Sequence, residues 1–245
     1  MHPRQHLIES LRKGICPDIL IIGGGINGVG IYRDLAAQGV PALLVEAGDF
    51  ASGTSSAPSR LIHGGLRYLE TGEAALVRES LTERNLLLHN ASHVVRPIAV
   101  WVPLRSWTGG TLMAALRFTG LVKNPGPKGA LVVKLGLVLY DLFGKAYRTM
   151  PKHRMLMRAQ ALQEVPPLSP DIRAVGEYYD ARISHPERLV TELVADAERD
   201  CPAAMAIPYL AAGPMENGRI TLIVRETNEK ISVAPRMVVN ASGAW

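Results

Sequence analysis

The sequence contains little cysteine, since its 245 residues include only Cys16 and Cys201. The two are not spaced as CxxC, and no further cysteine is present with which to build a disulfide framework. This composition argues against a small secreted fold held together by disulfides. A reducing, cytoplasmic setting fits it.

Long apolar runs are also absent. A membrane-spanning helix needs about 18 uninterrupted apolar residues, and the best candidate, residues 131–143, is interrupted by Lys134 and Asp141. The first 17 residues carry charges without a long apolar core, so they do not indicate a secretory signal. We therefore expect a chain that does not cross a membrane, although it could lie against one.

Metal-binding patterns are missing as well. The seven histidines show no HExxH or comparable ligand spacing, and no metal site is expected. Hydrophobic residues make up 47% of the chain and charged residues 20%, which is an ordinary globular composition. The length is sufficient for one large or two modest domains with a real core.

The most informative pattern that is present lies at residues 18–46. An apolar segment is followed by Gly23, Gly25 and Gly28, which satisfy G-x-G-x-x-G, and then by an amphipathic helical pattern ending near Gly39. In this context the first glycine permits a tight turn, the second lets the backbone approach a pyrophosphate, and the third allows close packing of the helix on the strand. The pattern predicts a dinucleotide-binding βαβ unit.

The second strand of this unit is followed by an acidic residue, Glu46. Residues 42–45 form a continuous apolar run, as expected for a parallel strand covered on both faces, and Glu46 follows directly. A carboxylate at this position can accept hydrogen bonds from ribose hydroxyls and would repel a 2′-phosphate. Glu46 therefore favours a cofactor of the NAD or FAD kind over NADP.

Further helices and strands are predicted along the rest of the chain. Residues 47–65 are rich in small and hydroxyl-bearing side chains and predict a loop. We expect helices at residues 73–93, 130–143 and 186–199, and strands at residues 100–104, 219–225 and 237–241. Ser184 and Glu187 have the spacing of a capping box for the last helix, and Asn217-Gly218 predicts a hairpin turn.

Residues 105–158 form a basic block, with ten Lys or Arg residues and one acid, Asp141. Three interpretations stand open. The block could attract anionic lipid together with the apolar stretch beside it, or it could be only a solvated helix face. Nucleic acid is the least favoured partner, because no recognised binding motif accompanies the charge.

Three blocks of the sequence carry a family resemblance: residues 19–46, residues 54–70 (TSSAPSRLIHGGLRYLE) and residues 238–245 (VVNASGAW). With these blocks the chain resembles the FAD-dependent glycerol-3-phosphate dehydrogenases, within the flavin oxidoreductase superfamily that includes D-amino acid oxidase. Generic flavoproteins share the first block, whereas the middle block is typical of this dehydrogenase family in particular.

The resemblance implies FAD-dependent oxidation of sn-glycerol 3-phosphate to dihydroxyacetone phosphate, with electrons passing on to a quinone. It implies that Arg67 and Tyr68 face the substrate, because a guanidinium fork suits a phosphate dianion and a phenol can add a hydrogen bond. It assigns no catalytic base. The residues that it implies for FAD binding are Gly23, Gly25, Gly28, Glu46, Thr54, Ser55, Ser56, Arg60, Leu61, Ser242 and Gly243.

The expected fold is α/β, with a Rossmann-like, doubly wound FAD-binding domain and a β-rich substrate portion. The expected organisation is an N-terminal tail (1–17), the first part of the FAD domain (18–104), a basic helical insertion (105–158), a partial substrate domain containing the helix at 186–199 (159–236), and a strand returning to the FAD domain (237–245). We expect a cytoplasmic enzyme, with peripheral contact with the inner membrane and homo-oligomerisation left open.

Members of the resembled family are considerably longer than this chain. We therefore expect the sequence to correspond to the N-terminal part of the enzyme, with weak or no activity by itself. One alternative is an inactive FAD-binding remnant, or a subunit completed by a partner chain. Another is an FAD-dependent amine or amino acid oxidase, against which the LIHGGLRY block argues.

Overall fold

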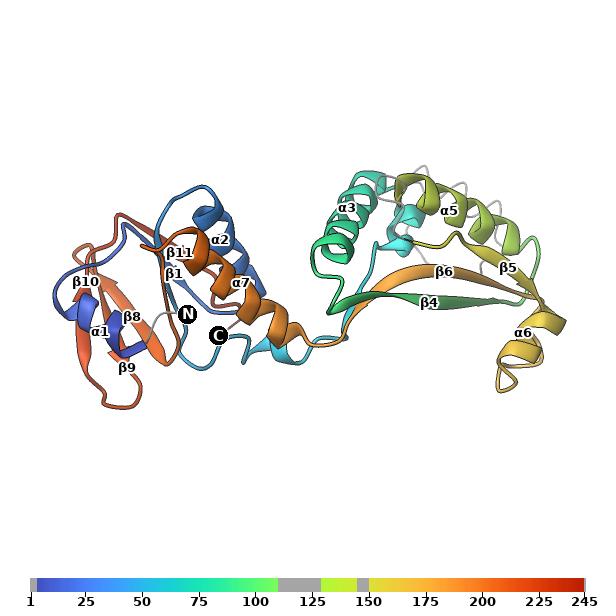
Figure 1. Cartoon of the computed structure of the whole chain (residues 1–245). Helices are drawn as coiled ribbons and strands as arrows, with labels where there is room; N and C mark the ends of the chain where they lie inside the picture. The colour runs from blue at the N-terminus through green and yellow to red at the C-terminus, as the bar shows by residue number, and fades with distance from the viewer. Residues whose placement is uncertain (1–3, 110–128, 145–149, 245) are drawn as a thin grey trace. The chain divides into compact units, whose positions relative to one another are not determined.

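The computed structural model describes residues 4–109, 129–144 and 150–244. The chain divides into two compact units (Figure 1). The first contains the residues up to 59 together with those from 185 onward, and the second contains residues 60–184.

A parallel sheet forms the centre of the first unit. Its strands, in spatial order, are β11 (Met237–Asn240), β1 (Ile19–Ile22), β2 (Ala42–Val45) and β7 (Met205–Ile207), and all neighbouring pairs are parallel. Helix α2 (Ile26–Ala37) connects β1 to β2. This is the predicted βαβ unit, and the prediction of an α/β fold with a parallel sheet is confirmed.

The two faces of this sheet are covered by different kinds of structure (Figure 1). Successive strand residues point to opposite faces, so Ile21 and Leu44 pack against α2 and α7 (Pro186–Asp200), while Leu20 and Leu43 pack into a second core. That second core is closed by α1 (Arg4–Arg12) and by an antiparallel sheet of β8 (Leu210–Glu216), β9 (Arg219–Val224) and β10 (Lys230–Val233). Burial on both faces explains why β1 and β2 are apolar throughout.

The second unit is built on an antiparallel sheet whose strands differ in length. Its strands are β3 (Leu61–Ile62), β4 (Val95–Leu104), β5 (Arg154–Met157) and β6 (Ala174–Ile183). Strand β6 pairs along its whole length with β4, while β3 and β5 pair with its two ends on the other edge. The short helix η2 (Leu66–Thr71) follows β3.

Within the described part of this unit, three α-helices pack on the sheet. Figure 1 shows α3 (Ala74–Asn90) and α5 (Ala130–Phe143) over one face. Helix α5 buries Val133 and Leu137 against β4 and β6, whereas α6 (Arg158–Glu164) shares a separate cluster with Val175. The helix predicted at residues 130–143 is therefore confirmed.

Two expectations need correction. Helix α7 begins at Pro186 after His185, without a side-chain cap, and the Ser184 hydroxyl instead donates to the Val94 carbonyl oxygen at 3.2 Å. The predicted capping box is wrong because the carbonyl of Val94, the residue before β4, competes for that hydroxyl. The domain boundaries also differ from those expected, since β4 pairs with β6 in the second unit. Strand β7 belongs to the parallel sheet, and α7 and β8–β10 pack on that sheet.

The hairpin turn predicted at Asn217-Gly218 is confirmed. The turn joins β8 to β9, and both of its residues have positive φ, 49° and 74°. Two-residue hairpins with this backbone favour Asn-Gly because the twist of such turns matches that of the flanking strands.

Leucines on the two faces of α5 provide a matched test of the packing. Leu137 is fully buried, whereas Leu135 is 63% exposed on the same helix. Leu137→Ala should lower the free energy of unfolding by about 2–5 kcal/mol, because it leaves a cavity. Leu135→Ala should change it by about 0.5 kcal/mol or less. Urea unfolding of both variants measures the difference, and equal losses would contradict this packing.

Candidate functional site

The glycine motif brings β1, α2 and β11 into close contact. A Cβ on Gly23, whose φ is +112°, would lie 2.5 Å from the Ala241 carbonyl oxygen. A Cβ on Gly28 would collide with the Gly23 carbonyl oxygen. Only hydrogen atoms fit at these two positions, so the turn can bring α2 and the end of β11 to within backbone contact.

The N-terminus of α2 faces the short helix η1 (Thr54–Ser56). Gly25 is the N-cap and supplies no side-chain cap, while the Ile26 amide donates to Ser55 Oγ at 3.0 Å. The uncapped N–H groups at the start of a helix favour an anion, both by hydrogen bonding and through the helix dipole. Ser55 places a hydroxyl at the same point.

The Glu46 carboxylate lies against the glycine loop. Its Oε2 accepts from the Gly24 amide and its Oε1 from the Gly48 amide, each at 2.7 Å. These charge-assisted bonds hold the end of β2 beside the turn that follows β1. A carboxylate oxygen can accept more than one hydrogen bond, so Glu46 is also able to receive ribose hydroxyls.

The turn after β11 reaches the same region. The Ala241 amide continues the pairing with β1 by donating to the Ile22 carbonyl oxygen at 2.8 Å. Asn240 Oδ1 then accepts from the amide and the hydroxyl of Ser242, at 3.1 and 2.8 Å. Gly243 follows in the left-handed region, with φ +78°. Asn240 was not identified from the sequence, although it fixes the predicted Ser242 turn.

The other expected FAD-binding residues have mixed environments. Thr54 and Ser56 lie in the short helix η1 (Thr54–Ser56), where the Ser56 hydroxyl donates to the Gly53 carbonyl oxygen at 2.8 Å. Arg60 and Leu61 begin the second unit. Arg60 is exposed with φ +60°, and Leu61 pairs with β6.

The expected substrate residues lie on η2 in the second unit. Arg67 and Tyr68 are both exposed, and Tyr68 retains 41% of its accessible surface. They are flanked by Leu66, which is partly buried, and by Leu69, which is 8% exposed. The helix therefore presents an arginine and a phenol to solvent from a well-anchored turn.

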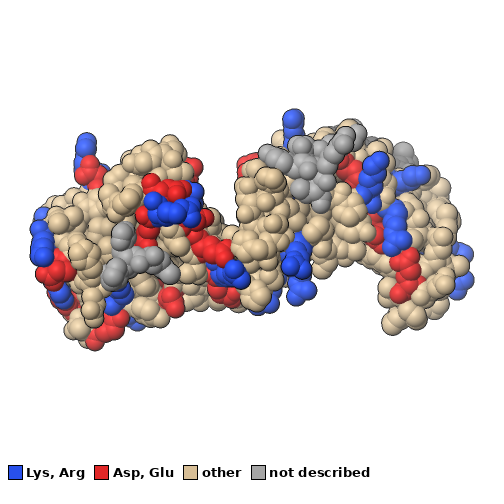
Figure 2. All heavy atoms as spheres, in the orientation of Figure 1, with Lys and Arg blue, Asp and Glu red and all other residues tan. Residues whose placement is uncertain are grey.

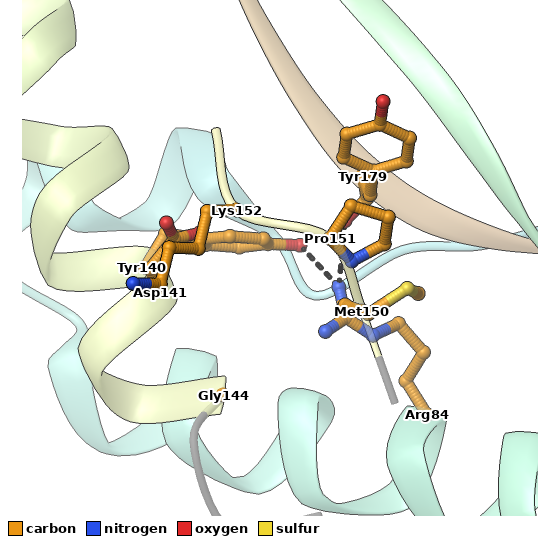
Figure 3. Close-up of a pocket in the computed structure, with 8 residues that line it drawn as sticks. All are labelled: Arg84, Tyr140, Asp141, Gly144, Met150, Pro151, Lys152 and Tyr179. Carbon is orange, nitrogen blue, oxygen red and sulfur yellow. Dashed lines mark hydrogen bonds between the residues drawn. The ribbon is translucent and has the colours of Figure 1, made fainter. Parts of the chain in front are cut away.

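A buried polar cluster lies beneath this turn and was not found from the sequence. Arg84 Nη1 and Asp180 Oδ1 form an ion pair at 2.9 Å, with the side chains 2% and 0% exposed. Figure 3 shows the Tyr140 hydroxyl directed toward the Arg84 guanidinium, at 3.2 Å. Arg84 and Tyr140 also line a cavity of about 680 Å³. No local motif unites these residues, which come from α3, α5 and β6.

Burial governs the ionisation of the tyrosines in this cluster. Burial, reinforced by the negative charge of Asp180, raises the pKa of Tyr178 to about 12. The same two causes raise the pKa of Tyr140 well above its ordinary value. Both hydroxyls therefore remain protonated at neutral pH and can donate hydrogen bonds.

Comparison with known protein families agrees with this geometry. The family described as FAD dependent oxidoreductase matches residues 18–245. The chain belongs to this family. The glycine turn and Glu46 are groups of this chain that could hold the dinucleotide part of an FAD cofactor.

Curated relatives of this chain act on phosphorylated polyols, according to their names. It is 37% identical to the glycerol-3-phosphate dehydrogenase of Synechocystis, over 93% of this chain and 39% of the relative. It is 34% identical to the D-erythritol 1-phosphate dehydrogenase of Brucella abortus, over 93% of this chain and 41% of the relative. The chain thus spans about two fifths of the length of these relatives.

Solved structures share the fold of this chain. The glycerol-3-phosphate dehydrogenase of Bacillus halodurans, solved with FAD, superposes with a TM-score of 0.66, covering 99% of this chain and 37% of that one at 24% identity. The L-proline dehydrogenase of P. horikoshii gives a TM-score of 0.63 at 19% identity. These likenesses establish the fold alone.

Two glycines of α2 test the close approach at the turn. Gly28→Ala should destabilise the protein by about 2 kcal/mol or more, because its Cβ collides with a backbone carbonyl. Gly30→Ala meets no atom within 4 Å and should stabilise the protein by about 0.5–1 kcal/mol through helix propensity. Thermal unfolding of the two variants, without added cofactor, checks this. Similar melting temperatures would overturn the steric argument.

Proposed function

We propose that this chain contains the FAD-binding part and part of the substrate-binding part of a dehydrogenase that oxidises sn-glycerol 3-phosphate to dihydroxyacetone phosphate. Bound FAD supplies the acceptor for the substrate hydride, and a quinone then receives the electrons. The observation that carries the proposal is the LIHGGLRY segment, which presents Arg67 and Tyr68 from η2 in a chain of the FAD-dependent oxidoreductase family.

Several contacts support an FAD site in the first unit. The glycine turn leaves the backbone of α2 accessible at its N-terminus, where Ser55 adds a hydroxyl. The pyrophosphate would bind at these N–H groups. Glu46 would accept the ribose hydroxyls of the adenosine half. Thr54, Ser56, Ser242 and Gly243 complete the proposed cofactor-binding set of this unit. Arg60 and Leu61, which begin the second unit, stay predicted cofactor-binding residues.

A phosphorylated substrate is favoured by the chemistry of η2. The Arg67 guanidinium is exposed, and it can bind a phosphate through two parallel hydrogen bonds. The Tyr68 hydroxyl can donate a further bond. An amine or amino acid substrate would not require this arginine, which makes the amino acid oxidase alternative less favoured.

A second candidate substrate is D-erythritol 1-phosphate. The relative with that name is 34% identical to this chain, a level similar to those of the glycerol-3-phosphate dehydrogenases. Both substrates are polyol phosphates, so both would use the same arginine. Direct comparison of the two compounds distinguishes them.

The first test is the visible spectrum of the purified chain, followed by anaerobic addition of glycerol 3-phosphate. A bound flavin should give a yellow protein whose absorbance near 450 nm bleaches as the substrate is oxidised. Flavin bound without bleaching would support the inactive-remnant alternative, or a subunit that needs a partner chain. A chain that binds no added FAD would contradict the cofactor proposal for these residues.

Arg67→Ala and Arg78→Ala form the matched pair for the substrate. Arg67→Ala should keep the flavin but weaken glycerol 3-phosphate binding by about 2 kcal/mol, since it removes a charge-assisted contact. Arg78 is exposed on α3 in the same unit, and its removal should leave the affinity unchanged. Calorimetric titration of both variants measures the effect, and an unaltered affinity in Arg67→Ala removes Arg67 from the site.

Peripheral attachment to an anionic membrane is the role that we propose for α5. Leu131, Leu135, Val138 and Leu142 are exposed along one side of the helix, and Lys134 is exposed beside them. Among the described residues, no helix is long and apolar enough to cross a bilayer. An exposed apolar stripe with adjacent basic charge suits binding in the membrane interface.

Two described arginines of the basic block form ion pairs with acidic residues, which reduces the positive charge that they present. Arg105 pairs with Asp171 at 2.9 Å, and Arg154 pairs with Glu164 and Glu177 at 2.9 and 2.8 Å. Figure 2 shows side chains of both signs scattered over the visible face of each unit. The attraction to lipid would therefore depend on the apolar stripe as well as on charge.

Vesicle sedimentation tests this attachment. The chain should sediment with phosphatidylglycerol vesicles at low salt and less at high salt, because added ions screen the attraction. Leu135→Glu should reduce the bound fraction, since it places a negative charge in the stripe. Equal recovery with phosphatidylcholine vesicles, or no effect of either change, would contradict the proposal.

A further inference from the structure

The buried cluster of Arg84, Tyr140 and Asp180 contacts the backbone amide of Gly64, just before the short helix η2 that carries Arg67. The Gly64 amide donates to Tyr140 Oη and to Asp180 Oδ1, each at 3.0 Å. The Tyr140 hydroxyl donates to the same Asp180 oxygen at 2.5 Å. Arg84 Nη1 adds a fourth contact, at 2.9 Å from Asp180 Oδ1. Tyr140 from α5 and Asp180 from β6 thus both contact Gly64, which precedes η2, and Arg84 from α3 contacts these two side chains.

The hydrogen-bonding roles in this cluster are fixed by charge. Because the raised pKa keeps Tyr140 protonated, its hydroxyl donates to the carboxylate and accepts from the Gly64 amide. Tyr140 packs edge-on against the Tyr178 ring, with centroids 5.5 Å apart, and its own ring lies 5.5 Å from the Arg84 guanidinium carbon. These contacts leave the Tyr140 hydroxyl little freedom to move.

Residue 64 must be glycine for this contact to form. A Cβ at this position would collide with the Leu81 side chain and the Tyr140 hydroxyl. Gly65 follows with φ +70°, and η2 then begins. Leu69 is packed with Leu81 and Tyr140 in one buried cluster. Arg67 therefore lies on a short turn held at one end by the Gly64 amide and at the other by Leu69.

We propose that Tyr140 and Asp180 are positioning residues for Arg67, because they fix the Gly64 amide from which the turn carrying Arg67 is built. Neither side chain needs to touch the substrate. The inference rests on the proposed function, in which Arg67 binds the substrate phosphate.

The matched variants are Tyr140→Phe and Tyr179→Phe, in the full chain loaded with FAD. Tyr140→Phe keeps the ring and removes the hydroxyl that contacts Gly64. Tyr179→Phe removes a hydroxyl on β6 that donates to Glu177 Oε1 at 2.7 Å, whereas the Gly64 amide donates to Tyr140 and Asp180. Asp180→Asn is a further variant, which removes the charge and should change affinity in the same direction if Tyr140→Phe does not fold.

Two measurements are made on these variants. Hydrogen exchange of a peptide covering residues 61–72 should become at least about fivefold faster in Tyr140→Phe, as expected for loss of one hydrogen bond. It should stay near the wild-type rate in Tyr179→Phe. The dissociation constant of glycerol 3-phosphate should rise about fivefold in Tyr140→Phe. Combined with Arg67→Ala, the Tyr140→Phe change should cause no further loss, because it acts through Arg67.

The outcomes separate this inference from the proposed function. If Arg67→Ala weakens binding but Tyr140→Phe does not, the positioning role is overturned while the phosphate role of Arg67 stands. The positioning role is also overturned if the two losses add, since a general destabilisation would act equally in both backgrounds. If Arg67→Ala has no effect, the proposed function of Arg67 fails, and the positioning role fails with it.

Discussion

The first unit depends on the contact between backbone atoms where β1 ends. Because Gly23 and Gly28 have no side chains, the end of β11 and the start of α2 can both reach the turn between them. This close backbone contact allows β11 to pair with β1 and places the N-terminus of α2 beside Ser55 of η1. The proposed anion site at the N-terminus of α2 is thus a consequence of backbone packing. A methyl group added at Gly23 or Gly28 would disturb the packing and the site together.

In the second unit, a buried ion pair rather than close backbone packing holds the elements together. The Arg84–Asp180 pair is buried, which costs desolvation energy that a hydrophobic pair would avoid. Its compensation is the set of hydrogen bonds made by Tyr140 and the Gly64 amide around the same carboxylate. Such a network specifies one arrangement of α3, α5 and β6 beneath η2, and the proposed substrate residues lie on that support.

The sequence allowed good prediction where the governing interactions are local. The glycine turn, the parallel strands and α5 followed from periodicity and from the steric needs of glycine. The capping box failed because the Ser184 hydroxyl could also donate to Val94, which lies 90 residues away in the sequence. The extent of β4 was underestimated since its first residues alternate less clearly and are stabilised by pairing with β6.

The sequence by itself determined the dinucleotide motif, the acid at Glu46 and the family to which the chain belongs, because each can be read from short continuous segments of the chain. Only the tertiary structure decided which residues meet beneath η2, since Arg84, Tyr140 and Asp180 are widely separated and share no spacing rule. It also decided that α7 packs with α2 on the parallel sheet. Long-range packing selects among partners that a local pattern leaves equivalent, and for this reason the supporting cluster could be found only in the folded chain.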